Sequence, residues 1–414
     1  MMNKFTKQTW AWIVYDVANA IFSALAVGFI FPIYIQNFLG GSEFQIGLIV
    51  SIALLLVAIT TPFLGALTDI LGNRSRIHKI FAILVPLFLL LVSIPVLPIS
   101  LIAMLFALFC FHNAIALYGA TMTSIAPHNK IGMVAGLGVS LGSLGTMVAI
   151  GIFYFISLLF GNGNAWENKD LLQMLFIVDA VLFFILIIPY SILIKDKISL
   201  IRKIVWREVK ICQSIKKVLL RLKATIGEIK QNKSIGWFYI GEFFYNNSII
   251  SLNLFLVLFA QQELKLSLPA FGGMYIGFLF VGVISSLITG WIVDKVGPKR
   301  VQITALVFWL AIIIGLIFSR DVPIFIALGT MGGIATGMLV SADRPMMVAL
   351  APREQIGKYF GFDEIVGRFS GSVGPFFYGL LISLWGYSAG LFLLFVFMVL
   401  SLFFIGLIKI KKAY

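Results

Sequence analysis

The sequence predicts an all-helical membrane protein, with twelve membrane-spanning helices in two pseudo-symmetric bundles of six. Hydrophobic residues make up 60% of the 414 residues and charged residues only 12%, whereas roughly 25% of an ordinary soluble domain is charged. Many apolar runs reach the ~20 residues that a helix needs to cross a bilayer. A short charged loop also recurs in the second half of the chain, again between two such runs.

The repeated loop reads GALTDILGNRSR at 65–76 and GWIVDKVGPKR at 290–300. Two glycines and one aspartate occupy matching positions, each pair 225 residues apart: Gly65 and Gly290, Asp69 and Asp294, Gly72 and Gly297. The dipeptides Ala126-Pro127 and Ala351-Pro352 repeat at the same spacing. The common offset indicates that the chain consists of two related halves.

The apolar runs place the twelve spans, in chain order, at residues 9–37, 44–70, 77–96, 99–124, 131–160, 171–194, 235–261, 268–293, 300–319, 322–350, 356–384 and 387–408. The third and fourth spans share one apolar stretch, which Pro95 and Pro98 interrupt. Because proline breaks the interior of a helix, we expect a tight hairpin there rather than one long helix.

Basic residues predict the orientation of these spans. They gather at alternate connections, including both ends of the chain and the segment between the two halves. By the positive-inside rule, both termini and this segment face the cytoplasm. We therefore expect an N-terminal bundle over 1–194, a cytoplasmic linker over 195–233 and a C-terminal bundle over 234–414.

The linker holds twelve Lys and Arg residues against three acidic ones, with apolar residues at helical spacing. This pattern predicts an amphipathic basic helix on the inner leaflet, where it attracts anionic lipid. A site for a regulatory partner is the alternative. The net charge of +14 does not indicate a nucleic-acid partner, because the basic residues lie at the ends of membrane spans.

We expect no metal site, no cofactor and no catalytic residues. The two cysteines, Cys110 and Cys212, lie in an apolar run and in the linker, so neither a disulfide nor a cysteine metal site is expected. The three histidines form no cluster at metal-ligand spacing. The sequence shows neither a nucleotide-binding loop nor a set of nucleophile, base and metal ligands, which argues against a primary pump and a membrane enzyme.

The pattern Gly-x-x-x-Asp-x-x-Gly followed by basic residues, once in each half, resembles the signature loop of the major facilitator superfamily. The resemblance implies two six-helix bundles with a substrate site between them at mid-membrane depth. Further segments are similar to the vacuolar amino-acid effluxer branch and its bacterial relatives: residues 12–22, 31–34 and 136–145, Arg344, and residues 360–361 and 374–375.

Ionisable groups inside the spans are the first candidates for a transport site, because an unpaired charge in the membrane is costly. Asp16 and Glu242 lie at nearly repeat-related positions, and the resemblance implies that their helices face the central cavity. The alternative is that each carboxyl group only bonds to a neighbouring helix. The residues expected at the substrate or proton site are Asp16, Asn19, Tyr15, Glu242, Asn246, Tyr118 and Arg344.

A second charged group lies in the tenth and eleventh spans, where Glu364 and Arg368 share one helix face. Two interpretations stay open. Arg344 fits a substrate carboxylate through a bidentate contact, and the group as a whole fits an inner gate of ion pairs. By the resemblance, the loop aspartates latch the cytoplasmic side. The residues expected in gating are Asp69, Arg74, Arg76, Asp294, Lys299, Arg300, Asp343, Asp363, Glu364 and Arg368.

Glycines recur at helical spacing in the fifth span, at 138, 142 and 145, and in the eleventh, at 367, 371 and 374. Small residues allow helices to approach closely in lipid, so we expect both sets to form packing faces or pivots between the bundles.

These features predict a monomeric secondary active transporter of a bacterial plasma (inner) membrane that works by alternating access. The expected cargo is a small polar metabolite, with an amino acid as a candidate, and protons or another ion are the coupling partner. A buried carboxyl group takes up a proton more readily than one in water, which suits proton coupling. Two alternatives stay open: an exporter of drugs or lipids, and a receptor or scaffold that keeps a transporter fold without transport.

Overall fold

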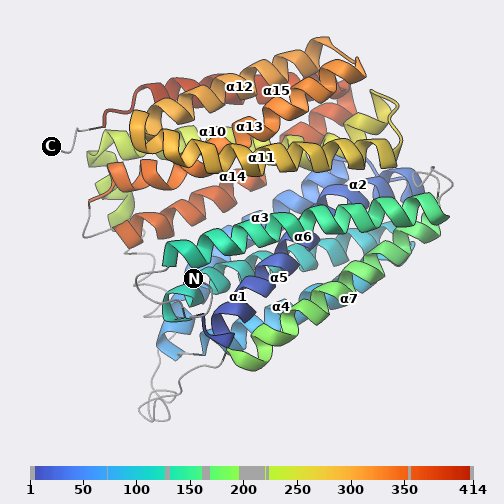
Figure 1. Cartoon of the computed structure of the whole chain (residues 1–414), viewed down its shortest axis with the longest axis horizontal. Helices are drawn as coiled ribbons and strands as arrows, with labels where there is room; N and C mark the ends of the chain where they lie inside the picture. The colour runs from blue at the N-terminus through green and yellow to red at the C-terminus, as the bar shows by residue number, and fades with distance from the viewer. Residues whose placement is uncertain are drawn as a thin grey trace. The chain divides into compact units, whose positions relative to one another are not determined.

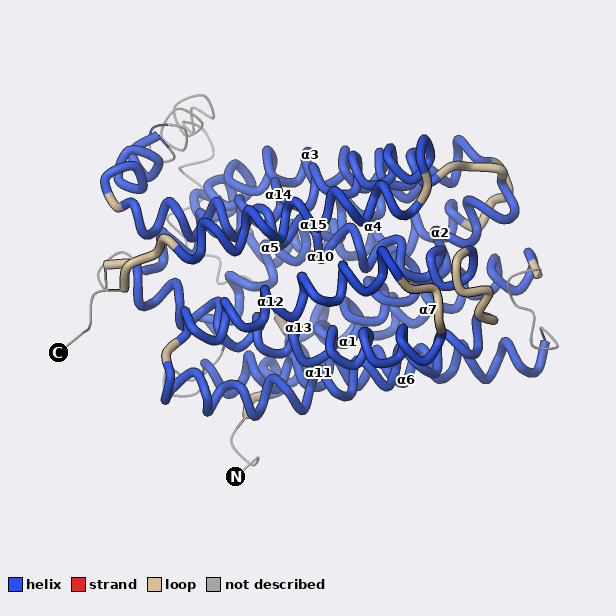
Figure 2. The backbone as a smooth tube through the Cα atoms, turned by 90° about the horizontal axis from the view of Figure 1, so that it is seen from above, coloured by secondary structure: helices blue, strands red, loops and turns tan. Residues whose placement is uncertain are grey.

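The computed structural model describes residues 5–71, 73–125, 131–160, 168–194, 220, 223–352 and 356–410. Within these residues the backbone is helical apart from short turns and caps, as Figure 2 shows. The chain divides into two compact units. Unit 1 comprises Met1–Gly41 and Ile52–Leu219, and unit 2 comprises Ser42–Ser51 and Leu220–Tyr414.

Unit 1 begins with one long helical segment that covers the first predicted span. Its parts are α1 (Lys7–Phe22), the π-helical η1 (Ser23–Ile30), the single turn α2 (Phe31–Ile33) and the π-helical η2 (Tyr34–Phe38). The helices that follow are α3 (Glu43–Leu71), α4 (Arg74–Val92), α5 (Leu97–Ile125), α6 (Ile131–Phe160) and α7 (Lys169–Leu193). The first turns of α3 are grouped with unit 2. Figure 1 labels these helices.

The long helices of unit 2 are α10 (Lys233–Gln262), α11 (Leu268–Val296), α12 (Pro298–Phe318), α13 (Val322–Leu350), α14 (Ile356–Trp385) and α15 (Tyr387–Gly406). Gly297 alone separates α11 from α12, and its φ of 85° lies in the left-handed region that glycine adopts without strain. Pro298 then opens α12, at a helix position whose N–H has no intrahelical acceptor.

The predicted all-helical membrane architecture is confirmed. In the part of the chain that the structure describes, eleven helices are long and apolar enough to cross a membrane. They coincide with eleven of the twelve predicted spans. The remaining span, 131–160, is the helix α6, in which the described apolar part runs over Ser140–Ile156. The hairpin expected at the two prolines is present, since α4 ends at Val92 and α5 begins at Leu97.

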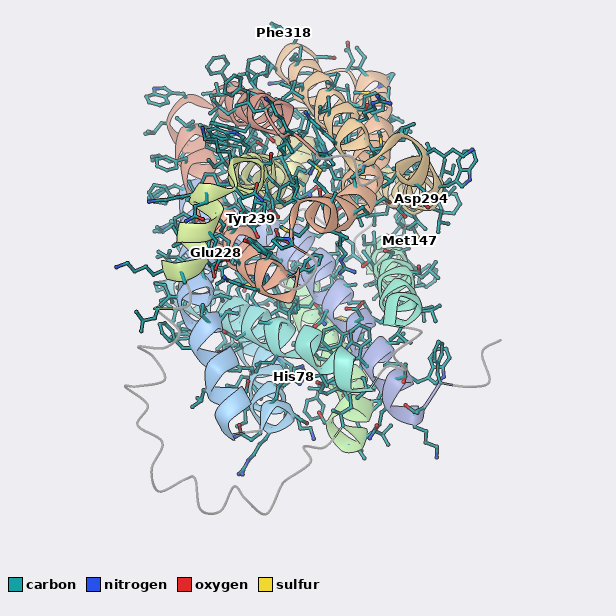
Figure 3. The ribbon with its side chains drawn as sticks, turned by 90° about the vertical axis from the view of Figure 1, so that its left-hand side faces the viewer. His78, Met147, Glu228, Tyr239, Asp294 and Phe318 are labelled. Atoms are coloured by element: carbon teal, nitrogen blue, oxygen red, sulfur yellow. The ribbon has the colours of Figure 1, made fainter. Side chains whose placement is uncertain are left out.

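Most of the predicted linker, 195–233, lies outside the described residues, so its amphipathic helix and the bundle boundaries stay predictions. Its described end is helical over 223–231. There Oε2 of Glu228 pairs with Nζ of Lys358 in α14 at 2.6 Å. Oε2 of Glu228 also accepts from the hydroxyl of Tyr359 at 3.4 Å, and the hydroxyl of Tyr239 donates to the Tyr359 carbonyl at 2.9 Å; Figure 3 labels Glu228 and Tyr239. This end of the linker therefore contacts the start of α14.

The two units repeat the same pattern of helix neighbours. In unit 1, α1 packs against α6 and α7, and α4 packs against α5 and α7. In unit 2, α10 packs against α14 and α15, and α12 packs against α13 and α15. The agreement supports the internal repeat found in the sequence, and it allows positions in the two units to be compared residue by residue.

The first helical segment of unit 1 differs from its counterpart α10. In η1 the backbone hydrogen bonds span five residues rather than four; for example, the N–H of Phe31 donates to the carbonyl of Ala26. In contrast, α10 is a regular α-helix from Lys233 to Gln262. Such π-helical segments are rare and often occur at functional sites.

The glycines of α6 and α14 pack against helices of their own unit. A Cβ added to Gly145 would lie 2.4 Å from Cγ1 of Val17 in α1. A Cβ at Gly374 would lie 2.5 Å from the carbonyl oxygen of Asn247 in α10, whereas one at Gly367 would meet open space. These contacts lie within each unit, whereas we expected packing faces or pivots between the bundles, and Gly367 takes no part in the α14 contact.

We expect Gly374→Ala to destabilise the protein, because the added methyl group would collide with the backbone of Asn247. Overpacking of this kind costs about 1–3 kcal/mol, which thermal unfolding of the purified protein would show as a lower melting temperature. Gly361→Ala is the matched control in the same helix, since its methyl group would meet open space. Equal melting temperatures for the two variants would contradict the close packing of α10 on α14.

Candidate functional site

Three carboxyl groups from three helices come together inside unit 2. Glu242 belongs to α10, Asp343 to α13 and Asp363 to α14. The carboxyl groups of Glu242 and Asp363 lie within hydrogen-bonding reach of each other, and the charge of Asp343 acts on Glu242. Sequence reasoning assigned Glu242 to the transport site and the two aspartates to a gate. The fold places all three in one carboxyl cluster.

Neutral polar side chains surround the carboxyl cluster. Gln302 of α12 donates a 2.9 Å hydrogen bond from Nε2 to Oδ1 of Asp343. Asn246 donates one of 3.3 Å from Nδ2 to Oε1 of Glu242, one turn earlier in α10. The hydroxyl of Tyr245 approaches the Asp343 carboxyl group. The cluster is therefore held by helices α10, α12, α13 and α14 together.

The carboxyl cluster keeps free hydrogen-bond acceptors. Oε2 of Glu242 and Oδ1 of Asp363 have no hydrogen-bond partner among the described residues. In the same part of the chain, no group of three or more His, Cys, Asp or Glu side chains is arranged to hold a metal ion. The three carboxyl groups thus meet pairwise and do not converge on one point as metal ligands do.

Two arginines lie beside the carboxyl cluster. Arg344 follows Asp343 in α13; its side chain is exposed, and its charge acts on Asp363. Arg368 pairs with Glu364 one turn earlier in α14. Arg344 is therefore the guanidinium group available to the cluster, while the other arginine is engaged by its own carboxylate.

The corresponding place in unit 1 holds one carboxyl group, that of Asp16 in α1. It lies next to Tyr118 of α5 and Asn19 of its own helix. A Cβ added to Gly138 would lie 2.8 Å from Oδ2 of Asp16, so α6 packs directly against this carboxyl group. Asn19 is buried, and neither of its amide atoms has a hydrogen-bond partner among the described residues.

The internal repeat aligns these two places position by position. At the common offset, Tyr118 corresponds to Asp343, Gly138 to Asp363 and, with a shift of one residue, Asp16 to Glu242. At the two matching positions, on α5 and α6 in unit 1 and on α13 and α14 in unit 2, unit 1 has a tyrosine and a glycine and unit 2 has two aspartates. The scaffold is shared, whereas the negative charge is concentrated in unit 2.

Aromatic side chains pack around Asp16 and its neighbours in unit 1. Trp12 and Tyr118 stack with ring centroids 4.2 Å apart. Nε1 of Trp12 donates to the carbonyl of Tyr118 at 3.2 Å, and the hydroxyl of Tyr118 donates to the carbonyl of Trp12 at 3.1 Å. Tyr15, expected at the transport site, is fully buried against Tyr118, Tyr190 and His78. It therefore belongs to the packed interior of unit 1.

The loop residues of unit 2 that were expected in gating lie at helix ends. Nζ of Lys299, at the start of α12, donates to the carbonyls of Gly406 and Ile408, each at 2.7 Å. It thereby satisfies one carbonyl at the end of α15 and one just beyond it, neither of which has an intrahelical donor. Asp294 is exposed near the end of α11, as Figure 3 shows, and Arg300 is exposed in the first turn of α12.

In unit 1, Arg74 and Arg76 lie in the first turn of α4, the former half-buried and the latter exposed. The side chain of Asp69 lies outside the described residues. The structure therefore places the basic members of the first loop and leaves the expected latch around its aspartate as a prediction.

Sequence reasoning missed Tyr245 and Gln302 as parts of the carboxyl cluster. Gln302 is completely buried in the second turn of α12, within a predicted membrane span. A buried amide in a membrane helix needs a partner, and this requirement was the available signal. Tyr245 carried no such signal, because tyrosine is common in apolar helices.

Comparison with known proteins decides the family. The sequence profile of the Major Facilitator Superfamily matches the chain twice, over residues 17–241 and 238–413. The chain belongs to the Major Facilitator Superfamily. Membership points to an integral membrane transporter and not to an enzyme, and the two matches agree with the internal repeat.

The chain is 23% identical over 421 residues to the uncharacterized MFS-type transporter YxiO of Bacillus subtilis (strain 168), covering 99% of this chain and 95% of the relative. The crystal structure of the nucleoside transporter NupG matches with a TM-score of 0.71 at 15% identity, covering 98% of this chain and 99% of that one. A bacterial homolog of the human lysosomal transporter Spinster, in an inward-facing and occupied conformation, matches with a TM-score of 0.68 at 13% identity, covering 97% and 95%. These structures support the major facilitator fold.

We expect Gln302 and Asp343 to be energetically coupled, because the amide donates the hydrogen bond that the carboxyl oxygen accepts. Gln302→Met keeps the length of the side chain and removes the donor, and it should lower the free energy of unfolding by about 1–3 kcal/mol. In a double-mutant cycle with Asp343→Leu, measured by thermal unfolding, the two losses should deviate from additivity by at least ~0.5 kcal/mol. Strictly additive losses would show that the contact is absent.

Proposed function

We propose that this superfamily member is a secondary active transporter that moves a small polar metabolite with an amino group by alternating access. Amino acids are the proposed cargo class, and protons are the proposed coupling ion. The observation that carries the proposal is the contact between the carboxyl groups of Glu242 and Asp363 inside unit 2.

Two carboxyl groups within hydrogen-bonding reach of each other need a proton between them. An ionised carboxylate only accepts hydrogen bonds, so a bond between Glu242 and Asp363 requires that one of them is protonated. If both were ionised, their repulsion in a membrane interior would be strong, because little water screens it. Either a proton or a cationic group of the cargo would relieve this repulsion. The proton and the cargo therefore compete for binding at the carboxyl pair.

The surroundings of the pair favour a zwitterionic cargo. An ammonium group has three donors and no acceptor, which suits the free oxygens of Glu242 and Asp363. The guanidinium of Arg344 suits a carboxylate through a bidentate contact. An amino acid carries both groups. The resemblance of several segments to the vacuolar amino-acid effluxer branch supports the same cargo class.

In this proposal, unit 1 contributes Asp16, with Asn19 and Tyr118 beside it, as the second polar place for cargo or protons. Ion pairs and helix-end contacts then control access from the cytoplasm. The residues that we assign to gating are Asp69, Arg74, Arg76, Asp294, Lys299, Arg300, Glu364 and Arg368. Asp343 keeps a gating role through its contact with the pair.

We further propose that the protein lies in the plasma membrane of a bacterium, with both termini and the linker on the cytoplasmic side. The distribution of basic residues supports this orientation. Anionic lipid would then contact the basic linker. The proposed active form is the monomer.

A thermal-shift screen tests the cargo class. Amino acids, nucleosides, sugars, organic acids, lipids and apolar drugs are each added to detergent-purified protein at mildly acidic and mildly alkaline pH. A ligand that binds the native state stabilises it, by about 2.7 kcal/mol at a hundredfold excess over Kd. We expect an amino acid to raise the melting temperature, and to do so more at the higher pH, because protons compete with its ammonium group.

Glu242→Gln and Asp363→Asn should abolish the pH dependence of that shift. Asp321→Asn is the control, since this aspartate is exposed and precedes the first turn of α13. Stabilisation only by lipids or apolar drugs would contradict a polar cargo and favour the drug or lipid exporter. Stabilisation by no ligand class would favour a receptor or scaffold.

A further inference from the structure

A buried carboxyl group that the proposed transport site does not use lies in unit 1. Asp179, near the middle of α7, has an exposed fraction of 0%. Neither of its carboxyl oxygens has a side-chain hydrogen-bond partner among the described residues, and its one polar neighbour is the backbone of Ala26. This carboxyl group lies near the middle of a helix that is long and apolar enough to cross a membrane. A carboxyl group at such a position is a candidate functional group by default.

The face of α7 that carries Asp179 packs along the first helical segment of unit 1. Phe176 and Phe183, about one turn to either side, contact aromatic rings of η2 and α1, with ring centroids 5.4 and 5.8 Å apart. Between these contacts, Asp179 lies against the backbone of Ala26. Ala26 belongs to η1, so the carboxyl group faces the π-helical segment Ser23–Ile30.

No ionisable side chain among the described residues acts on Asp179. On the first helical segment, Tyr15 and Tyr34 contact other parts of α7. On α4, His78 contacts Tyr15 and a tyrosine near the end of α7. The sequence of α6 contains no acidic or basic residue. The described surroundings of Asp179 therefore supply apolar side chains and backbone, with no countercharge.

Unit 2 is built without either feature. Its α15, which corresponds to α7, contains no acidic residue. Its α10, which corresponds to the first helical segment of unit 1, is a regular α-helix throughout. The repeated fold therefore requires neither a buried acid nor a π-helical segment at this contact. Their occurrence together in unit 1 points to one shared role.

We propose that Asp179 and η1 form a proton-binding site in unit 1. The proton adds to one carboxylate oxygen, where it forms an O–H bond and removes the negative charge. A neutral carboxyl group is far less costly in an apolar interior than an ionised one. A metal cation fits less well, because hard cations take several oxygen ligands, and the described residues contain no such group.

Proton release from Asp179 would change the first helical segment. The resulting carboxylate needs hydrogen-bond donors, and the backbone of Ala26 in η1 is the polar group beside it. A π-helical segment differs from an α-helix by one hydrogen-bond register, so a donor withdrawn from η1 shifts its bonding. The same segment carries Asp16. Transport of this proton rests on the proposed function. Its binding at Asp179 does not depend on that proposal.

Infrared spectroscopy of the full-length protein in proteoliposomes, without cargo, tests the site. Spectra are recorded from mildly acidic to mildly alkaline pH for the wild type and for Asp179→Asn, which keeps the side-chain shape and cannot bind the proton. The wild-type spectrum minus that of Asp179→Asn should show one carboxylic-acid C=O band through neutral pH, because the proton shared by Glu242 and Asp363 gives a signal in both proteins that cancels. Asp170→Asn, an exposed aspartate in the first turn of α7, should keep the band.

An ionised-carboxylate signal in place of the acid band, assigned to Asp179 by the same comparison, would overturn the proposal. If Asp179→Asn does not fold, carbodiimide labelling of the wild type at neutral pH replaces it, because carbodiimides react with protonated carboxyl groups. Mass spectrometry should find the modification at Asp179, and its absence there would overturn the proposal. Both measurements are made without cargo, so a negative result at Asp179 would not contradict the proposed transport function. Likewise, a negative cargo screen would not contradict the proton site.

Discussion

The contact between Glu242 and Asp363 is the interaction on which the account depends. In water, two carboxyl groups would simply ionise and separate, but here α10 and α14 hold them together within a membrane domain. The same two helices approach closely at Gly374 and Asn247, where a side chain at 374 would collide with the backbone of α10. Gln302 and Asn246 then supply hydrogen bonds without adding charge, so the pair keeps its need for a proton or a cation.

The internal repeat explains how one fold carries two unlike sites. Both units pack their helices in the same pattern, yet the positions of Tyr118 and Gly138 in unit 1 are taken by Asp343 and Asp363 in unit 2. Unit 1 in turn has the π-helical η1 and a buried acid on α7, which unit 2 lacks. The two units therefore share their packing, whereas the polar groups at matching positions differ between them.

Hydropathy and proline placement predicted nearly every helix, because apolar length and missing backbone donors act locally. The repeated loop likewise predicted two related halves. The carboxyl cluster could not be predicted in the same way, since the meeting of Glu242 with Asp363 depends on which faces of α10 and α14 touch. The burial of Tyr15 among aromatic rings could not be predicted either, because it depends on which face of α1 packs against α5 and α7. The π-helical hydrogen bonding of η1 could not be predicted either, because the hydropathy pattern does not reflect it.

Cargo-driven proton movement in proteoliposomes tests the proton-coupled account most directly. The protein is reconstituted into vesicles that contain a pH-sensitive dye, and an amino acid that stabilises it is added outside in the absence of any ion gradient. The account predicts that cargo entry changes the internal pH in wild-type vesicles and leaves it unchanged with Glu242→Gln. Cargo uptake at wild-type rates with no pH change in either preparation would contradict it.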